Sequence, residues 1–143
     1  MSDKIRWGIL GCGKIANKFA SDLKLVQDAE LKAVASRNAA RLESFSRQHQ
    51  APLKFDSYEG LVTSPDVDVI YVATPHGLHY EHVLLCLNHD KSVLCEKAFA
   101  LNLRQAREMV QLARNKKVFL MEAFWTRFIP QYKEVMDIVR SGR

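Results

Sequence analysis

The sequence has few cysteines, and their spacing excludes a common class of metal site. Its 143 residues include three cysteines, Cys12, Cys86 and Cys95, with no C-x-x-C pair among them. A zinc site built from paired cysteines is therefore not expected. Free cysteines in an odd number are typical of proteins in a reducing, intracellular compartment.

The sequence also lacks a long apolar run. No window approaches the roughly 20 apolar residues of a membrane span. Residues 1–6 carry no basic cluster followed by an apolar stretch of signal-peptide length. We therefore expect a soluble, cytoplasmic protein with no membrane partner.

The charge pattern lacks the features of a nucleic-acid-binding protein. The chain has 21 basic and 16 acidic side chains, a net charge of +5, with no block of five like charges. Because it has neither a basic stripe nor a recognition motif, we expect no nucleic-acid partner. A mild positive surplus attracts phosphorylated small molecules as readily as it attracts DNA or RNA.

What the sequence does contain is enough apolar material for one folded domain. Hydrophobic residues make up 48% of the chain and charged residues 26%, which is typical of a globular protein and excludes intrinsic disorder. A length of 143 residues fits one domain of ordinary size.

Apolar runs of strand length alternate with stretches of helical periodicity along the whole chain. The run at 67–73 is almost entirely apolar, as in a central strand that is buried on both faces of a parallel sheet. Alternating strands and helices predict an α/β fold, a doubly wound and mainly parallel sheet of about six strands joined by right-handed crossovers. The predicted strands are 5–10, 31–36, 53–55, 67–73, 92–95 and 118–123, and the predicted helices are 14–25, 37–50, 58–62, 78–88, 103–115 and 131–139.

A glycine-rich segment joins the first predicted strand to the first predicted helix. Residues 11–16 read G-C-G-K-I-A and match the G-x-G-x-x-A pattern of dinucleotide-binding loops. The first glycine permits a tight turn, and the second has no Cβ to keep a diphosphate away from the backbone. Amides at the start of a helix then face the anion. We predict that the cofactor-binding residues here are Gly11, Cys12, Gly13, Lys14 and Ile15.

The end of the second predicted strand distinguishes between the two nicotinamide cofactors. A carboxylate at this point binds the ribose 2′-hydroxyl of NAD, but here the strand ends in Ser36 and Arg37. A guanidinium pairs well with a phosphate, Ser36 can donate its hydroxyl, and Arg41 lies one helical turn further on. We therefore predict NADP rather than NAD. The alternative, in which Arg37 is only a solvated residue at a helix start, remains open.

Three more motifs follow the fourth, fifth and sixth predicted strands. They are A-T-P-H-G-L-H at 73–79, E-K-A-F-A-L-N at 96–102 and M-E-A-F-W-T-R-F at 121–128. The carboxyl ends of parallel strands meet at one edge of a sheet, where open α/β folds bind their ligands. We expect all three motifs to face one cleft.

Together with the glycine loop, these motifs resemble the Gfo/Idh/MocA family of NAD(P)-dependent oxidoreductases, and within it the dihydrodiol dehydrogenase-like branch. The resemblance implies a Rossmann domain whose nicotinamide lies between the T-P-x-x-x-H and E-K-P loops. It implies that Thr74, Pro75 and His79 line the cofactor, that Glu96 contacts it, and that Trp125 and Arg127 flank its nicotinamide end.

Lys97 is the predicted catalytic residue, and it is also predicted to contact the cofactor. The resemblance places the lysine of E-K-P beside the carbon that accepts hydride. A group that removes or stabilises a hydroxyl proton is needed there, and a partly desolvated lysine can do either. Ala98 stands where the family has proline, which relaxes the backbone constraint after Lys97. A solvated surface lysine is the alternative interpretation.

These inferences predict the cofactor-binding half of an NADP-dependent oxidoreductase. Residues 1–128 are predicted to form the dinucleotide-binding domain, and residues 129–143 a helix that leads toward a second α/β domain, which the resemblance implies and this chain lacks. The reaction would move hydride between nicotinamide and an alcohol or carbonyl carbon of a sugar, polyol or diol. The full-length protein would be a homo-oligomer, and this chain alone would have slight activity.

One other interpretation remains beside this one. The chain could be a regulatory module that binds NADP without catalysis, since its phosphate loop would be the same. His76, His79 and His82 recur every third residue, but they have no obvious carboxylate partner, so no metal site is expected. His82 is expected on the helix surface.

Overall fold

The computed structural model describes residues 4–142 and contains a six-stranded sheet. Its strand order is β3-β2-β1-β4-β5-β6, and every neighbouring pair is parallel. The chain builds one half of the sheet outward from β1 and then returns to place β4 on the other side of β1, which confirms the predicted doubly wound sheet. The strands are β1 (Ile5–Leu10), β2 (Ala29–Ala35), β3 (Leu53–Phe55), β4 (Val69–Val72), β5 (Ser92–Cys95) and β6 (Leu120–Glu122).

The predicted helices are all present, and the ends of the predicted elements differ from the observed ends by at most two residues. Two short 3₁₀ helices, one after β4 and one after β6, were not predicted. The α-helices are α1 (Lys14–Leu23), α2 (Ala39–His49), α3 (Tyr58–Thr63), α4 (His79–Asn88), α5 (Leu103–Lys116) and α6 (Pro130–Arg140), and the 3₁₀ helices are η1 (His76–Leu78) and η2 (Trp125–Phe128).

Asparagine side chains set the starts of two helices. Asn102 caps α5, because its Oδ1 accepts a hydrogen bond of 3.0 Å from the Gln105 amide. Asn38 caps α2 in the same way, accepting from the Arg41 amide at 2.9 Å. The prediction that this helix begins at residue 37 is therefore wrong, and Arg37 lies in the loop that follows β2.

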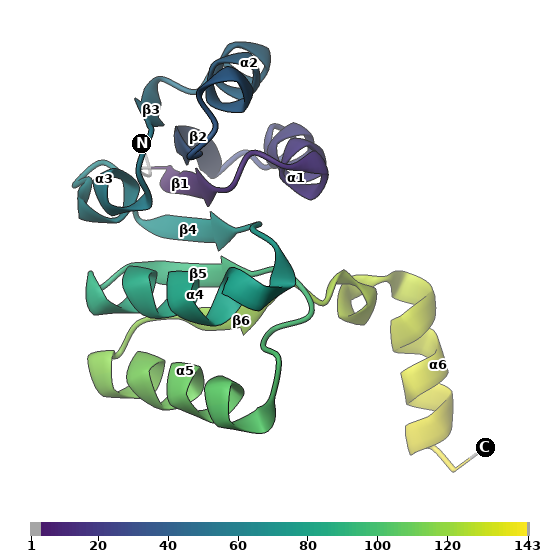
Figure 1. Cartoon of the computed structure of the whole chain (residues 1–143). Coiled ribbons are helices and arrows are strands. Elements are labelled where there is room, and N and C mark those ends of the chain that lie inside the picture. The colour runs from purple at the N-terminus through teal and green to yellow at the C-terminus, as the bar shows by residue number, and fades with distance from the viewer. Residues whose placement is uncertain (1–3, 143) are drawn as a thin grey trace.

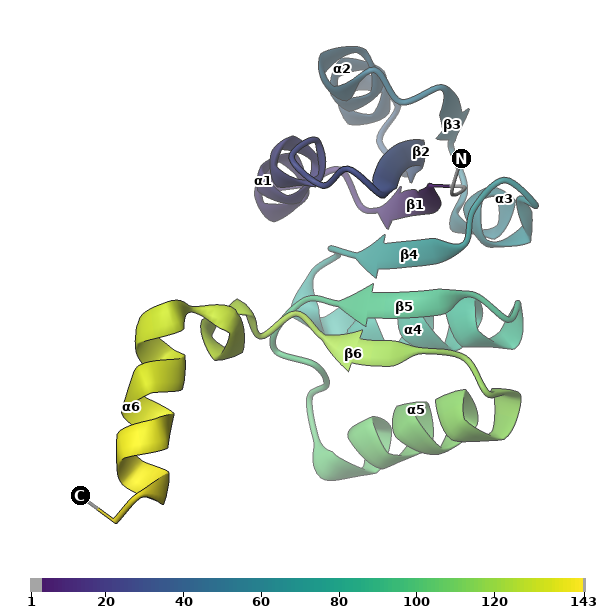
Figure 2. The same ribbon diagram turned by 180° about the vertical axis from the view of Figure 1, so that it is seen from behind.

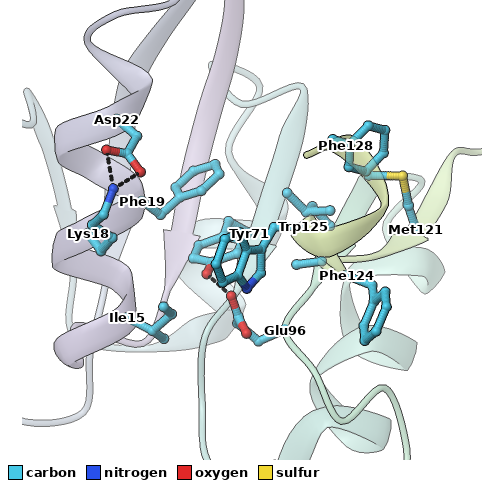
Figure 3. Close-up of a pocket in the computed structure, with 12 residues that line it drawn as sticks. Ile15, Lys18, Phe19, Asp22, Tyr71, Glu96, Met121, Phe124, Trp125 and Phe128 are labelled. Atoms are coloured by element: carbon cyan, nitrogen blue, oxygen red, sulfur yellow. Dashed lines mark hydrogen bonds and ion pairs between the residues drawn. The ribbon is translucent and has the colours of Figure 1, made fainter. Parts of the chain in front are cut away.

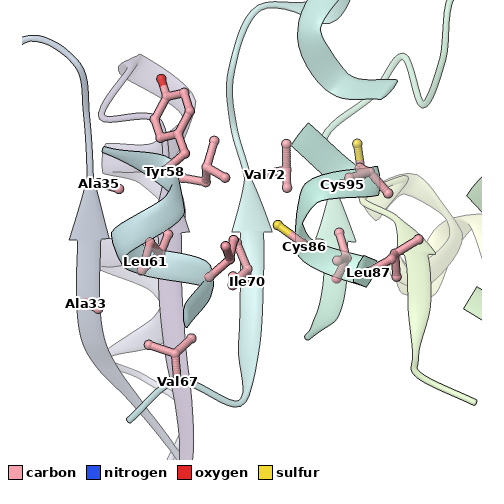
Figure 4. Packing of buried hydrophobic residues seen from close by; sticks show 14 of the residues in the cluster. Ala33, Ala35, Tyr58, Leu61, Val67, Ile70, Val72, Cys86, Leu87 and Cys95 are labelled. Carbon is pink, nitrogen blue, oxygen red and sulfur yellow. The ribbon is translucent and has the colours of Figure 1, made fainter. Parts of the chain in front are cut away.

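Helices lie on both faces of the sheet, and on the face seen in Figure 2 they flank β1 and β2 but not β5 and β6 (Figures 1 and 2). The face covered by α3, α4 and α5 carries the larger hydrophobic core, in which Ile70 and Val72 of the central strand β4 are fully buried against Leu61 and Leu87 (Figure 4). The other face packs against α1 and α2 through a smaller core that includes Ile9 of β1. Burial of β4 on both faces matches its apolar sequence.

Helix α6 projects away from these layers and is joined to them through η2 (Figure 1). None of its residues is buried. The predicted domain boundary falls between η2 and α6, and the role of this helix as a lead into a second domain stays a prediction. Residues 1–3 and 143 of the two predicted ranges lie outside the described residues.

Neither a membrane helix nor a metal cluster occurs in the described part of the chain. Within residues 4–142 no helix combines the length and apolarity needed to cross a bilayer. Over the same residues, no group of three or more His, Cys, Asp or Glu side chains could hold a metal ion.

An ion pair at the amino-terminal edge of the sheet makes stability depend on pH. The Arg6 guanidinium donates to both oxygens of Asp68, at 2.7 and 3.0 Å, and holds the pKa of that carboxyl below its usual range. A lowered folded-state pKa contributes stability above the unfolded value of about 3.9, and this contribution is lost as the pH falls through the folded-state pKa. Because the pair is partly exposed, its effect is modest.

We expect Arg6→Met to lower the urea midpoint of unfolding at pH 7, and the difference from wild type to be smaller at pH 3, because Asp68 of the unfolded chain takes up a proton there and part of the contribution of its lowered folded-state pKa is lost. Urea denaturation at the two pH values measures this. A difference of the same size at both pH values would show that the effect does not come from the ion pair.

Candidate functional site

The two glycines after β1 differ in why they are needed. Gly11 has a φ of +101°, and a Cβ there would lie 3.0 Å from the Ala73 carbonyl oxygen and 3.0 Å from Thr74 Cγ2. Gly11 is therefore required by the fold. At Gly13 the added Cβ would meet only the Ala73 oxygen, at 3.9 Å. The fold leaves open space at Gly13, which an approaching ligand can use.

Gly13 is also the N-cap of α1, and no side chain caps this helix. No acidic residue lies in its first turn either. Unpaired amides and the positive end of the helix dipole therefore face outward from this point. Such a helix start binds phosphate groups.

A polar groove of about 310 Å³ begins at this helix start. It contains two cationic side chains, Lys14 and Arg41, and no carboxylate lines it. Three residues of the glycine loop thus line the same groove as Arg41. Their roles in binding a cofactor stay predictions. We call this cavity the phosphate groove, and it is lined by Cys12, Gly13, Lys14, Asn17, Arg41, Ser44, Phe45 and Gln48.

Cys12 is a structural member of the loop. A helix start lowers the pKa of an accessible thiol, but here burial raises the pKa of Cys12 to about 11. Its Sγ donates to the carbonyl oxygen of Ala35 at 3.7 Å. Cys12 therefore remains a neutral thiol that ties the glycine loop to the end of β2.

Ser36 and Arg37 lie at the end of β2. Ser36 is buried, and its Oγ accepts from the Asn38 amide at 3.2 Å, which leaves the hydroxyl proton available to donate. Arg37 is exposed, and its Cζ lies 4.8 Å from the centre of the Tyr58 ring. Neither Arg37 nor Arg41 forms an ion pair with a carboxylate in residues 4–142. Both guanidinium groups are therefore available to an anionic ligand.

Two histidines of α4 form hydrogen bonds to the loop that follows β4. His82 is 4% exposed, and its Nδ1 lies 2.9 Å from Thr74 Oγ1. The expectation that His82 lies on the helix surface is wrong, because α4 turns this residue toward the buried Thr74 and the ring of Tyr58. Burial, and then the positive charge of Arg37, lower the pKa of His82.

His79 joins the loops after β4 and β5. Its side chain has no exposed surface, and its Nε2 and Nδ1 lie 2.8 Å from the carbonyl oxygens of Thr74 and Ala98. The ring can therefore act on a cofactor only through the two loops that it joins. Pro75, next in the same loop, is exposed. The roles of Thr74, Pro75 and His79 as cofactor-lining residues stay predictions.

Glu96 and Lys97 follow β5. One Glu96 oxygen accepts from the Tyr71 hydroxyl, and the other accepts from the Lys97 amide at 3.1 Å. The peptide bond between Lys97 and Ala98 is cis. Lys97 itself is exposed, so the partial desolvation expected of a catalytic lysine is not supplied by residues 4–142.

An apolar pocket of about 440 Å³ lies on the α1 side of the sheet (Figure 3). Tyr71, Leu94 and Met121 are side by side on β4, β5 and β6 and form its floor. The walls come from α1 and from the segment 123–128. The lining residues are Ile15, Lys18, Phe19, Asp22, Tyr71, Leu94, Glu96, Met121, Ala123, Phe124, Trp125 and Phe128.

This pocket unites three residues predicted from separate motifs, Ile15, Glu96 and Trp125. The predicted Arg127 is not among its lining residues and instead borders a cavity beside α6 that also contains Lys133 and Asp137. Sequence reasoning missed Phe19 and Tyr71. The spacing of four residues between Ile15 and Phe19 was a usable signal, because such residues share a helix face.

The glycine loop separates the two cavities. Lys14 lines the phosphate groove and its neighbour Ile15 lines the apolar pocket. An elongated ligand that placed an anionic group at Gly13 could therefore extend a ring toward Glu96. Such a ligand would have phosphates in its middle and an apolar ring at one end.

Comparison with known proteins matches the chain to an oxidoreductase family with an NAD-binding Rossmann fold, over residues 5–124. The chain is 43% identical over 136 residues to the trans-1,2-dihydrobenzene-1,2-diol dehydrogenase of Xenopus tropicalis, covering 94% of this chain and 41% of the relative. For the enzyme of that name from Mus musculus, the identity is 43% over 140 residues, covering 96% and 42%. The chain thus spans about two-fifths of the length of these relatives.

Solved structures give the same result. KijD10, a 3-ketoreductase from Actinomadura kijaniata in complex with NADP and TDP-benzene, superposes with a TM-score of 0.92 at 32% identity, over 98% of this chain and 43% of that one. An NAD-binding oxidoreductase from Klebsiella pneumoniae superposes with a TM-score of 0.88 at 28% identity, over 97% and 39%.

Proposed function

The chain belongs to the Gfo/Idh/MocA oxidoreductase family, and from this premise we propose that it is the NADP-binding half of an enzyme that moves hydride between nicotinamide and an alcohol or carbonyl carbon. The observation that supports this most directly is the uncapped start of α1, which lies between a cationic polar groove and an apolar pocket. The parts of a dinucleotide follow the same order as these features, because its diphosphate lies between two nucleosides.

The residues of the site fit this cofactor. The amides after Gly13 would hold the diphosphate, and Ser36, Arg37 and Arg41 would hold a 2′-phosphate. Of these three, only Arg41 lines the phosphate groove, which contains no carboxylate to repel an anion. Ile15, Glu96 and Trp125 would surround the nicotinamide end. Bound NADP would supply a hydride acceptor, and NADPH a hydride donor.

Lys97 is the proposed catalytic residue. Its amide is bound by Glu96, and His79 holds the carbonyl oxygen of Ala98, so the backbone on both sides of the lysine is fixed. The Lys97 ammonium group would hold or move the proton of the reacting hydroxyl group. Sugars, polyols and diols are the proposed substrates, since relatives are named for a dihydrobenzenediol and a keto substrate. A homo-oligomeric full-length protein and a cytoplasmic location stay predictions.

Titration of NADPH and NADH into the chain, followed by calorimetry, tests the proposed cofactor. We expect both to bind and NADPH to bind more tightly. If neither cofactor binds, the proposal is overturned. If NADH binds more tightly than NADPH, the choice of NADP is overturned.

The role of Lys97 is tested in the longest natural form of the protein that contains this chain. We expect Lys97→Met to lower the turnover of an alcohol with NADP, and to leave the dissociation constant of NADP within about twofold, because a group that acts on the proton contributes to the transition state. Unchanged turnover would remove Lys97 from the mechanism. Cofactor binding without any turnover in the unaltered protein would favour a regulatory module.

A further inference from the structure

Tyr71 is a buried phenol whose hydroxyl points at the candidate site. The side chain lies in the middle of the sheet on β4 and is 2% exposed. Its ring stacks on Phe19 of α1, with ring centres 3.9 Å apart and planes inclined by 16°. The hydroxyl donates to Glu96 Oε1 (Figure 3). Burial, and then the bond to Glu96, raise the pKa of Tyr71, so the phenol remains a hydrogen-bond donor at neutral pH.

The position of Glu96 explains how two residues so far apart in sequence meet. Tyr71 pairs with Leu94 across the β4–β5 ladder. Glu96 follows Leu94 by two residues, and residues two apart in an extended chain point to the same face. The Glu96 side chain therefore returns toward the α1 face of the sheet, where it reaches the Tyr71 hydroxyl.

The Glu96 carboxylate is held at both oxygens. Oε1 accepts from Tyr71, and Oε2 accepts from the Lys97 amide at 3.1 Å. Each carboxylate oxygen has two lone pairs, so a carboxylate with two donors can still accept from a ligand. In a mainly apolar pocket, Glu96 thus presents an acceptor whose orientation is set by its protein partners.

We propose that Tyr71 is a positioning residue for the nicotinamide end of the cofactor. It orients the Glu96 carboxylate toward hydroxyl or amide donors of the nicotinamide nucleoside. Because Glu96 also accepts from the Lys97 amide, Tyr71 helps to hold the backbone at Lys97. The Tyr71 ring forms part of the pocket floor, but its hydroxyl is bound to Glu96, so the effect of that hydroxyl on the ligand passes through Glu96. This inference rests on the proposed binding of NADP.

The chain contains a matched control for this hydrogen bond. The Tyr80 hydroxyl donates to the carboxylate of Glu108, which joins α4 to α5 on the opposite face of the sheet. Tyr71→Phe and Tyr80→Phe each remove one phenol–carboxylate bond and keep the aromatic ring. Because Tyr71→Phe preserves the stacking on Phe19, we expect the variant to fold.

The test compares two ligands, NADPH and 2′,5′-ADP, which carries the adenosine phosphates without the nicotinamide half. We expect Tyr71→Phe to weaken NADPH about tenfold, as for loss of a hydrogen bond to a charged group, and to leave 2′,5′-ADP within about twofold. Tyr80→Phe should change neither affinity. A merely structural role of Tyr71 would weaken both ligands in parallel, and that result would overturn the inference, as would an unchanged NADPH affinity.

A double-mutant cycle tests whether Tyr71 acts through Glu96. In a Glu96→Gln background, Tyr71→Phe should change NADPH affinity by less than about twofold, because coupled effects are not additive. A full tenfold effect in that background would contradict the proposed route. Failure of the unaltered chain to bind either ligand would overturn the proposed function itself, whereas binding of both with no selective loss in Tyr71→Phe would overturn only the role of Tyr71.

Discussion

Gly13→Ala should raise the dissociation constant of NADP by about 100-fold or more, since several amide hydrogen bonds to a charged diphosphate are lost together. The expected change in folding stability is small. The new methyl group would meet only the Ala73 oxygen, at 3.9 Å, and the φ of −92° suits alanine. Replacing an N-cap glycine by alanine costs about 1 kcal/mol at most. Calorimetric titration and urea denaturation measure the two effects separately.

Gly11→Ala is the matched comparison, because it lies in the same loop but is limited by the protein itself. With φ at +101° and a Cβ 3.0 Å from a backbone oxygen, it should lose about 1–3 kcal/mol of stability as well as cofactor binding. Normal NADP binding by Gly13→Ala would show that the diphosphate does not approach this loop. A large loss of stability in the same variant would show that the space at Gly13 serves the fold.

Arg37→Ala should weaken NADP by about 10- to 100-fold and leave NAD affinity unchanged. The magnitude follows from the loss of charge-assisted hydrogen bonds to the 2′-phosphate, about 1.5–3 kcal/mol. The guanidinium is exposed, lies over the Tyr58 ring and has no carboxylate partner in residues 4–142. Its removal should therefore cost little stability. Parallel titrations of NADP and NAD into both proteins measure the selectivity.

Arg47→Ala controls for the loss of one positive charge. This arginine lies on α2, is paired with Glu43 at 3.4 Å and is 80% exposed at its side chain. We expect no change in the affinity for either cofactor. Equal NADP affinity in Arg37→Ala and the unaltered chain would contradict the proposed role of Arg37. An equal loss of NADP affinity in Arg37→Ala and Arg47→Ala would show that Arg37 acts only through the net positive charge of the protein.

Features that depend on neighbours in the sequence were predicted well. The alternation of apolar runs with helical periods was sufficient for the parallel sheet, because both signals arise from local backbone geometry. The glycine loop was recognised for the same reason, since its turn and helix start are encoded within six residues.

Features that depend on packing between distant elements were predicted less well. His82 was expected on a surface, but the loop after β4 and Tyr58 of α3 bury it. The family resemblance placed Arg127 beside Trp125 at the nicotinamide end of the cofactor, and in the structure the two residues border different cavities. Lys97 was expected to be partly desolvated, and in residues 4–142 it is exposed.

By itself, the amino-acid sequence determined the order of strands and helices, the glycine loop and the family to which the chain belongs, because each of these is encoded in short, contiguous patterns. Only the tertiary structure decided that Tyr71 holds Glu96 and that His79 joins two loops. These contacts connect residues 25 and 19 positions apart. They exist because parallel strands bring the carboxyl ends of distant segments together at one edge of the sheet.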